Sequence, residues 1–230
     1  MLVAGFPAGP FGTNCWVLAT GRGSEAVIVD PGMDARAGIE QVVAEHHLRP
    51  VAVVLTHGHI DHMWSVLPVA DGYDIPAWVH PGDRALLADP FAGVSAQTRA
   101  AFAHLVGSAG FAEPADVREL VDGAELDLAG LTMVADHAPG HTPGSTAFRL
   151  RDPDGGPLML SGDLLFAGSI GRTDLPGGDH AAMLASLRRV VLSQPDEMVV
   201  LPGHGATTTI GRERRTNPYL QALAPGGAQR

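Results

Sequence analysis

The sequence predicts an α/β (α+β) protein in which two β-sheets pack face to face and helices cover the outside. Two groups of short apolar, β-branched segments, separated by Gly, Pro and Asn turns, lie near the N-terminus and from Val117 onward. Helical stretches accompany both groups. Because a sheet must bury its apolar face against another layer, two groups with their own helices favour a layered sandwich. We expect residues 1–230 to form a single domain.

The first half should begin with antiparallel strands and continue into a parallel β-α-β unit. A helix is expected over 34–47, where Ile39, Val42 and Val43 share one face. A further helix is expected at 63–70, with helical and loop material over 81–106. The strands expected in this half are 2–6, 15–19, 25–29, 51–55 and 77–80.

The second half should contain most of the hairpins. Turn signals such as Asp122-Gly123 and Gly155-Gly156 separate its strand segments. Two helices are expected, at about 179–192 and 211–222. The strands expected are 117–121, 125–128, 131–136, 145–150, 157–161 and 197–201.

Composition limits the possible partners. The formal net charge of −10 repels polyanions, which argues against nucleic acid or an anionic membrane and favours a small-molecule substrate. Cys15 is the only cysteine, so no intramolecular disulfide can form. We see no signal peptide and no apolar stretch of about 20 residues, and we expect a cytoplasmic protein. The sequence does not indicate an oligomeric state.

The densest chemical signal is Thr56-His57-Gly58-His59-Ile60-Asp61-His62, directly after a predicted strand. In an extended loop His57 and His59 point the same way, because side chains alternate. Asp61 and His62 lie where a helix is about to begin and can turn toward a neighbouring point. One short segment can therefore serve two adjacent metal ions.

Three further candidate ligands each follow a glycine at the end of a predicted strand. They are His141 after Gly140, Asp163 after Gly162 and His204 after Gly203. Glycine lets the backbone bend there, so that a polar side chain projects from the edge of a sheet. The repeated pattern indicates one shared site.

These motifs resemble the metallo-β-lactamase superfamily, and within it the glyoxalase II-like (hydroxyacylglutathione hydrolase-like) branch of small bacterial hydrolases. The resemblance covers nearly the whole chain and implies a four-layer αββα sandwich of two mixed sheets, without a separate C-terminal helical domain. It rests on the HxHxDH core at 57–62 and on the blocks at 12–15, 29–32, 140–145, 161–163, 171–174, 202–205 and 217–218.

The resemblance also implies a ligand set. His57, His59 and His141 would hold one metal ion. Asp61, His62 and His204 would hold a second, and Asp163 would bridge the two. Nitrogen and carboxylate ligands without thiolate suit two Zn²⁺ per chain, and Fe or Mn also fit such a set.

The implied reaction is attack of a metal-bridging hydroxide on a thioester, such as an S-2-hydroxyacyl thiol conjugate. Asp61 and Asp163 are the catalytic candidates, since both would act as metal ligands. A thiol has a pKa of about 8.5 and leaves as thiolate without a dedicated general acid. Lactones and other esters are alternative substrates for the same chemistry.

Three more residues are expected near the site. Asp30 resembles the acidic residue behind the ligands and would orient an imidazole. Arg172 would contact substrate or brace its loop. Trp64 stands where many relatives carry a small residue, and it would narrow the pocket or stack on substrate, or else pack against a neighbouring helix. Only a short helix with arginines follows His204, so recognition of glutathione does not follow from the sequence.

Two functions of other classes compete with the hydrolase. Persulfide dioxygenases share the motifs but hold a single iron, here with His57, His141 and Asp163 as ligands. A complete set of seven ligands favours the hydrolase. A nuclease of the same fold is disfavoured by the charge of −10 and the absence of a basic stripe.

Overall fold

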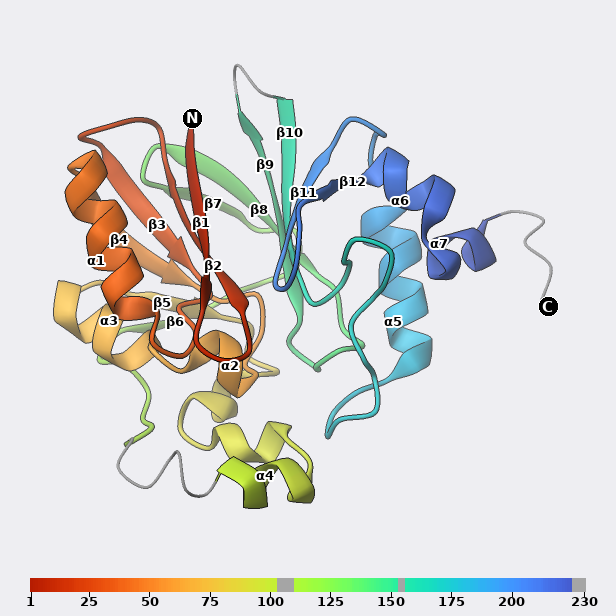
Figure 1. Cartoon of the computed structure of the whole chain (residues 1–230), viewed down its shortest axis with the longest axis horizontal. Coiled ribbons are helices and arrows are strands. Elements are labelled where there is room, and N and C mark those ends of the chain that lie inside the picture. The colour runs from red at the N-terminus through yellow and green to blue at the C-terminus, as the bar shows by residue number, and fades with distance from the viewer. Residues whose placement is uncertain (103–109, 153–155, 225–230) are drawn as a thin grey trace.

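Two six-stranded sheets form the centre of the molecule in the computed structural model, which describes residues 1–102, 110–152 and 156–224 (Figure 1). The first sheet has the order β1-β2-β3-β4-β5-β6, and the second has the order β12-β11-β10-β9-β8-β7. The strands of the first sheet are β1 (Leu2–Ala8), β2 (Thr13–Ala19), β3 (Glu25–Val29), β4 (Arg49–Val54), β5 (Ala77–Val79) and β6 (Val117–Glu119). Those of the second are β7 (Glu125–Leu128), β8 (Leu131–His137), β9 (Thr146–Asp152), β10 (Gly156–Gly162), β11 (Val199–Pro202) and β12 (Thr208–Thr209).

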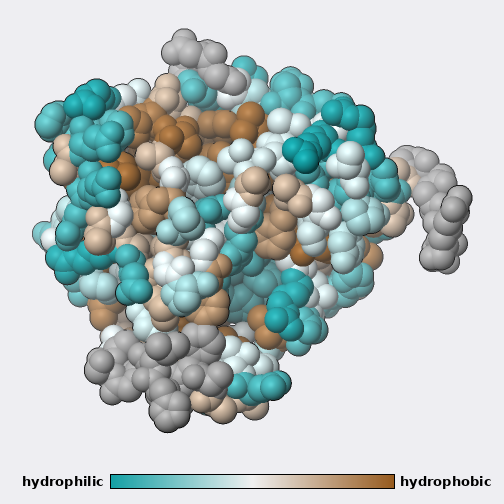
Figure 2. Space-filling model, viewed as in Figure 1, coloured by the Kyte–Doolittle hydropathy of each residue, from teal (hydrophilic) through white to brown (hydrophobic). Residues whose placement is uncertain are grey.

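Helices cover the outer face of each sheet. Figure 1 shows α1 and α3 beside the first sheet and α5, α6 and α7 beside the second. In the space-filling view, hydrophilic residues cover the outer sides of α1 and α6 (Figure 2). The helices are α1 (Ala35–His46), α2 (Ile60–Met63), α3 (Val66–Tyr73), α4 (Ala96–Phe102), α5 (His180–Ser186), α6 (Ile210–Thr216) and α7 (Pro218–Leu223), with short 3₁₀ turns at Arg84–Leu87 and Pro90–Gly93 and a π-helical turn at Leu187–Val191. The predicted four-layer sandwich of two mixed sheets is confirmed.

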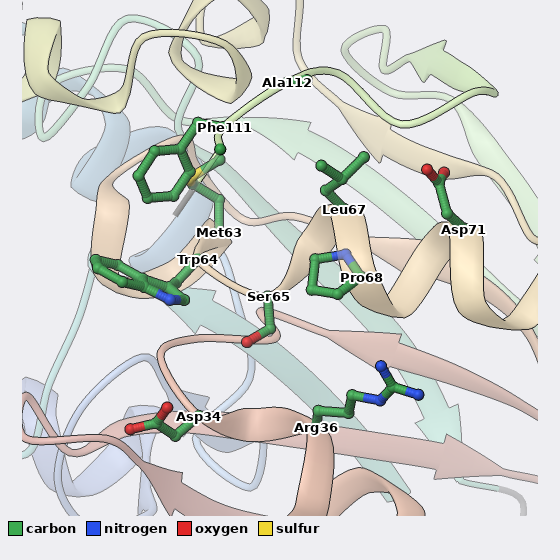
Figure 3. A pocket seen from close by; sticks show the side chains of 11 residues that line it. Asp34, Arg36, Met63, Trp64, Ser65, Leu67, Pro68, Asp71, Phe111 and Ala112 are labelled. Atoms are coloured by element: carbon green, nitrogen blue, oxygen red, sulfur yellow. The ribbon is translucent and has the colours of Figure 1, made fainter. Parts of the chain in front are cut away.

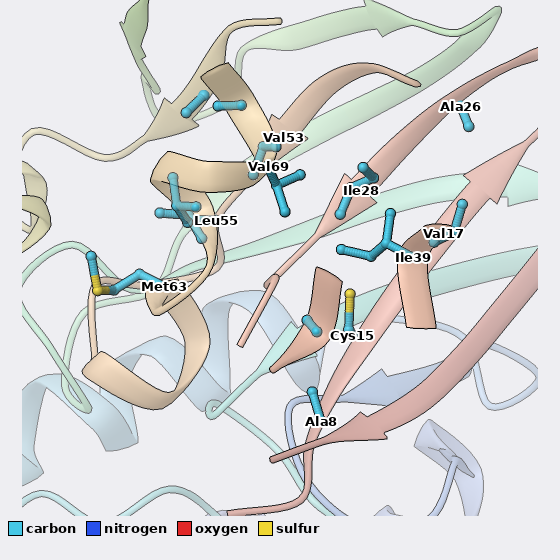
Figure 4. Packing of buried hydrophobic residues seen from close by; sticks show 14 of the residues in the cluster. Ala8, Cys15, Val17, Ala26, Ile28, Ile39, Val53, Leu55, Met63 and Val69 are labelled. Carbon is cyan, nitrogen blue, oxygen red and sulfur yellow. The ribbon is translucent and has the colours of Figure 1, made fainter. Parts of the chain in front are cut away.

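Three apolar clusters lie between the four layers. In β3 the buried side chains alternate, so that Ile28 packs outward toward Ile39 of α1 while Val27 and Val29 face the second sheet. Figure 4 shows the outer cluster, in which Ile28, Ile39 and Val69 lie together. Phe148 is fully buried between the sheets. Each strand of this kind is apolar on both faces, as expected of strands covered on both sides.

Parallel pairing brings chain segments that are far apart in sequence to one edge. In the first sheet β3 pairs parallel with β4, and in the second β10 pairs parallel with β11. β8 runs in the same direction as β10, because each is antiparallel to β9. The carboxyl ends of parallel strands meet at the same edge, where open α/β sheets bind their ligands. The segments that follow β8, β10 and β11 therefore lie at one edge of the second sheet. The segment that follows β4 is joined to the second sheet by a hydrogen bond from the Thr146 N–H to the Thr56 carbonyl, at 2.8 Å.

Two predicted helices are broken in the structure. The helix expected at 63–70 is divided into α2 and α3 at Ser65, whose N–H and hydroxyl bond the carbonyls of Pro31 and Gly32, at 2.9 and 2.7 Å. α2 itself begins at Ile60, before the predicted start at residue 63. The helix expected at 211–222 is divided at Asn217, because the residue before a proline avoids helical geometry.

The other predicted elements are present within a few residues of their expected bounds. The part of the 81–106 prediction that falls on residues 103–106 lies outside the described residues. Within the described ranges, no helix is long and apolar enough to cross a membrane.

Candidate metal centre

The seven predicted ligand side chains meet at this edge of the sheets. His57 and His59 follow β4, and Asp61 and His62 lie on α2. The other three side chains follow strands of the second sheet: His141 after β8, Asp163 after β10 and His204 after β11. The structure thus brings together residues separated by up to 147 positions, since His57 and His204 mark the two ends of the set.

Three buried imidazoles form a first group, consisting of His57, His59 and His141. One potential ligand atom from each lies within 4.8 Å of the others. His59 Nδ1 is 2.8 Å from His141 Nε2, and the ring of His57 stands nearly perpendicular to both neighbouring rings. Three nitrogens that converge in this way offer one face of a tetrahedral metal site.

Asp61, His62 and His204 form a second group, which is also within 4.8 Å. His204 Nε2 lies 3.1 Å from Asp61 Oδ2 and 3.2 Å from His62 Nε2. His62 is fully buried, whereas the side chain of His204 is 29 % exposed. This group is therefore the more open of the two.

Asp163 lies between the two groups. Its Oδ2 is 3.4 Å from His141 Nε2 of the first group, and its Oδ1 is 3.4 Å from His62 Nε2 of the second. Oδ2 also lies 3.8 Å from His204 Nε2, so the carboxylate is in contact with both groups, as a bridging ligand must be. The bridging role itself remains a prediction.

Unpaired polar atoms support metal binding by this cluster. In the described part of the chain, four buried side-chain polar atoms lack a hydrogen bond: His57 Nε2, His59 Nε2, Asp163 Oδ1 and Trp78 Nε1. Three of the four belong to the cluster. Because buried polar atoms without a partner destabilise a fold, and most have one, this concentration indicates groups arranged for a ligand. The residues present fit a divalent cation.

Burial and neighbouring charges set the pKa values of these groups. Burial lowers the pKa of His57, and it lowers the pKa of His59 to about 3, with repulsion from nearby imidazoles adding to both shifts. Burial, the largest single effect, opposes ionisation of Asp61 and Asp163, but the surrounding imidazoles, His62 foremost, together outweigh it and lower the pKa of both carboxyls. Neutral imidazoles and ionised carboxylates are the forms that bind metal ions.

Asp30, the residue after β3, connects both groups from behind. Its carboxylate accepts hydrogen bonds from the N–H and the hydroxyl of Thr56, at 2.8 and 2.6 Å, and it lies 2.9 Å from His62 Nδ1. The Thr56 hydroxyl also lies 3.1 Å from His57 Nδ1. Asp30 thus touches one imidazole directly and reaches a second through Thr56, which fixes the orientation of both rings.

A cleft of about 400 Å³ opens onto the cluster. Its apolar wall includes Phe11, Ile60, Val94 and Leu175, and the candidate ligands form its floor. Val94 comes from the segment just before α4, which Figure 1 shows at the lower end of the molecule. The cleft combines an apolar wall with a few polar groups, as small-molecule sites do.

Comparison with known proteins agrees with this geometry. The family model of the metallo-β-lactamase superfamily matches residues 8–204, which include all seven candidate ligands. The chain belongs to the metallo-β-lactamase superfamily. The resemblance drawn from the sequence motifs is thereby confirmed.

Superfamily members similar over their full length are found in several bacteria. An uncharacterized protein of Mycobacterium tuberculosis is 47 % identical, with 97 % of this chain and 100 % of the relative aligned. A protein of Haemophilus influenzae named hydroxyacylglutathione hydrolase GloC is 32 % identical, covering 94 % of this chain and 96 % of that protein.

Two solved structures of the superfamily are also similar. The B3 metallo-β-lactamase BLEG-1 has a TM-score of 0.82 and 40 % identity, over 95 % of this chain and 99 % of the other. TTHA1623 in a di-iron-bound form has a TM-score of 0.76 and 39 % identity, over 94 % and 100 %. The fold and the metallo-hydrolase superfamily are therefore clear, and the substrate is left open.

Trp64 lies away from the metal cleft. It lines a separate pocket of about 410 Å³ together with Met63 and Phe111, and its ring meets that of Phe111 edge to face at 5.2 Å (Figure 3). The expectation that Trp64 narrows the metal pocket therefore finds no support, and its contacts match the alternative, packing against a neighbouring segment.

Arg172 lines the metal cleft and braces its own loop, and its contact with substrate stays a prediction. Its guanidinium donates two hydrogen bonds to the exposed carboxylate of Asp174, at 2.7 and 2.8 Å. Its backbone carbonyl lies 2.7 Å from His141 Nδ1. The main chain of Arg172 thus orients a candidate ligand, while its side chain stands at the cleft wall.

Sequence reasoning missed several residues behind the ligands. The Thr13 hydroxyl donates to Asp61 Oδ2 at 3.0 Å, and the Asn14 amide donates to the carbonyls of Pro202 and Gly205 on either side of His204. Asp83 is fully buried beside the loops of His57 and His141. Asp83 follows Gly82 after a strand, the same signal that identified the three later ligands.

We expect Asp30→Asn to weaken metal binding by about 10- to 100-fold, the usual cost of changing a group behind a ligand. The backbone of Asp30 has a φ of 50°, which asparagine tolerates, so the turn should survive. If the amide nitrogen takes the place of Oδ2, it cannot accept the hydrogen bonds that Thr56 and His62 make to this oxygen. Competition with a chelator for Zn²⁺ measures the effect, and an affinity within threefold of the wild type would contradict this role.

Gly203→Ala should also remove metal. A Cβ at this position would lie 2.3 Å from Asp163 Oδ1 and 2.7 Å from His62 Cε1, so two candidate ligands would have to move. Gly72→Ala on α3 is the matched control, since a Cβ there meets nothing within 4 Å. Metal analysis should show loss only in Gly203→Ala. Equal metal content in both variants would be inconsistent with ligands held at these positions.

Proposed function

We propose that this chain is a thioester hydrolase with two Zn²⁺ ions, one in each group of ligands and with Asp163 between them. The observation that carries the proposal is the convergence of two groups of three ligand side chains with Asp163 between them, where three buried polar atoms lack a hydrogen bond. The 32 % identity with a protein named hydroxyacylglutathione hydrolase supports thioesters as the substrate class.

Bound metal ions would supply a hydroxide nucleophile at neutral pH and polarise the carbonyl of the substrate. The protein holds the ligands for this purpose. His57 and His59 are kept neutral by burial, and Asp61 and Asp163 are kept ionised by the imidazoles around them. Asp30 and the carbonyl of Arg172 orient the rings of His62 and His141. No Ser/His/Asp triad is needed.

The cleft suits a small acyl thioester. Phe11, Ile60 and Leu175 give its wall an apolar surface, against which an acyl chain or a thiol carrier can pack. A thiolate leaves without assistance from an acid, as its conjugate acid has a pKa of about 8.5. The C-terminal arginines do not supply a counter-charge in the cleft; Arg214, for example, pairs with Asp196. Glutathione is therefore not favoured over other thiol carriers.

The net charge of −10 supports a small molecule as partner and disfavours nucleic acid or membrane. The single cysteine, which is buried, is in keeping with a cytoplasmic protein.

Persulfide oxidation by one iron ion is the second candidate. A similar protein with 39 % identity has been crystallised with two irons, which supports iron as an alternative metal but also supports a site for two ions. The second group of ligands, which is complete here, favours the dinuclear hydrolase. Lactones and other esters remain variants of the hydrolytic reaction.

The test is metal analysis of the purified chain together with a substrate panel of acyl thioesters, lactones and glutathione persulfide. We expect two metal ions per chain and release of free thiol from thioesters, followed with a thiol reagent. Oxygen consumption on glutathione persulfide with one iron per chain would overturn the proposal in favour of the dioxygenase. Faster turnover of lactones than of thioesters would overturn the substrate class alone.

A further inference from the structure

Asp83 lies in the turn after β5, and none of its surface is exposed. Its Oδ2 accepts hydrogen bonds from the Gly58 N–H at 2.8 Å and from the Thr142 hydroxyl at 2.6 Å. Its Oδ1 accepts a third from the Gly144 N–H at 2.7 Å. Gly58 stands between His57 and His59, and Thr142 follows His141. One carboxylate oxygen therefore joins the two loops that carry the first group of ligands.

The surrounding turns are packed closely enough to hold this carboxylate in place. A Cβ on Gly144 would lie 2.6 Å from Asp83 Cγ, and a Cβ on Gly82 would lie 3.0 Å from Gly144 N, so only glycines allow this approach. On the neighbouring side, the rings of His80 and His137 stack at 3.9 Å and 7°. The turn after β5 is thus docked against the loop of His141.

We infer that Asp83 is a positioning residue that holds His57, His59 and His141 in a preformed arrangement and thereby sets the affinity of the first metal ion. The inference rests on the proposed metal binding, but it concerns a residue that would not touch the metal. Asp83 makes no hydrogen bond to Asp61, His62 or His204 in the described contacts. Its effect should therefore be confined to the first group.

The role requires a carboxylate. All three partners donate, and both oxygens of Asp83 accept. In Asp83→Asn the amide nitrogen would replace one oxygen and face the N–H of Gly58 or of Gly144, leaving that N–H without an acceptor. The side chain keeps its size, so the change acts on loop geometry and not on packing volume.

Zn²⁺ affinity, measured by competition with a chelator, tests the inference in two backgrounds. His204→Ala disrupts the second group and leaves the first. His59→Ala does the reverse. Adding Asp83→Asn to His204→Ala should lower the Zn²⁺ affinity of the first group by about 10- to 100-fold. Adding Asp83→Asn to His59→Ala should leave the Zn²⁺ affinity of the second group within threefold of the affinity in His59→Ala alone. Equal effects in both backgrounds, or none in either, would overturn the inference.

Glu213→Gln is the matched control. Glu213 is also fully buried and accepts three hydrogen bonds, from Gly168 N–H, Thr208 and Asn217, none of which adjoins a candidate ligand. It should leave Zn²⁺ affinity in the His204→Ala background unchanged, and a loss equal to that of Asp83→Asn would show a general effect of disturbing a buried carboxylate and refute the inference.

Two milder variants keep the inference testable if Asp83→Asn does not fold. Thr142→Val removes the hydroxyl that donates to Asp83 and also lies 2.8 Å from the Ser145 hydroxyl, and Thr142→Ser retains it. Weaker binding of the first ion in Thr142→Val, restored in Thr142→Ser, would support the inference, and equal affinities would refute it. A wild-type chain that binds no Zn²⁺ would instead contradict the proposed function itself.

Discussion

Asp163→Ala should lose nearly all hydrolase activity and at least one metal ion while the chain remains folded. Asp163 presents one oxygen to each group of ligands at 3.4 Å, so its removal affects both. Because changing a group behind a ligand already costs up to about 100-fold in activity, losing a bridging ligand should cost more than that. Thioester turnover and metal content per chain measure the two losses.

Asp127→Ala provides the comparison for this variant. Asp127 is an exposed carboxylate on β7 that accepts a hydrogen bond from Thr132, far along the sheet order from β10 and β11. Its loss should change neither activity nor metal content. If Asp163→Ala retained two metal ions, the bridging assignment would be wrong even if activity fell.

Removing the metal should lower the thermal stability of the chain substantially. In the metal-free cluster the buried atoms His57 Nε2 and Asp163 Oδ1 have no hydrogen-bond partner, and neighbouring imidazoles repel one another when protonated. A ligand present at 1,000 times its Kd stabilises a fold by about 4 kcal/mol. At about 2 to 4 °C per kcal/mol for a chain of this size, a strong chelator should lower the Tm by roughly 8 to 16 °C.

Calorimetry with and without chelator measures this shift, and added Zn²⁺ should restore the original Tm. A double variant that lacks His57 and His204 serves as control, because one ligand is missing from each group. Its Tm should hardly respond to the chelator. A wild-type Tm that is indifferent to both chelator and Zn²⁺ would mean that the cluster holds no stabilising metal.

The layers of the fold and the residues that meet at the site could be predicted from the sequence. Segments such as 25–29 are apolar on both faces, which predicts a strand covered on both sides, and these residues form the buried strand β3. The candidate ligands were predictable because four of them fall within the segment 57–62, and the other three each follow a glycine at a strand end. Their convergence depends on strand order, which the structure supplies through the parallel pairs β3–β4 and β10–β11.

Features that depend on tertiary contacts were not predictable. The helical pattern continues through Ser65, and only the hydrogen bonds from Ser65 to Pro31 and Gly32 show why α2 stops there. Asp83 carries the signal of a glycine after a strand, but its partners Gly58, Thr142 and Gly144 are known only from the structure.

The central claim is that seven side chains hold two metal ions, and the most direct measurement is an anomalous difference map from crystals of the purified chain, recorded at the absorption edge of the metal found by elemental analysis. We predict two peaks, one among His57, His59 and His141 and one among Asp61, His62 and His204, with Asp163 between them. A map in which either group lacks its peak would contradict the account.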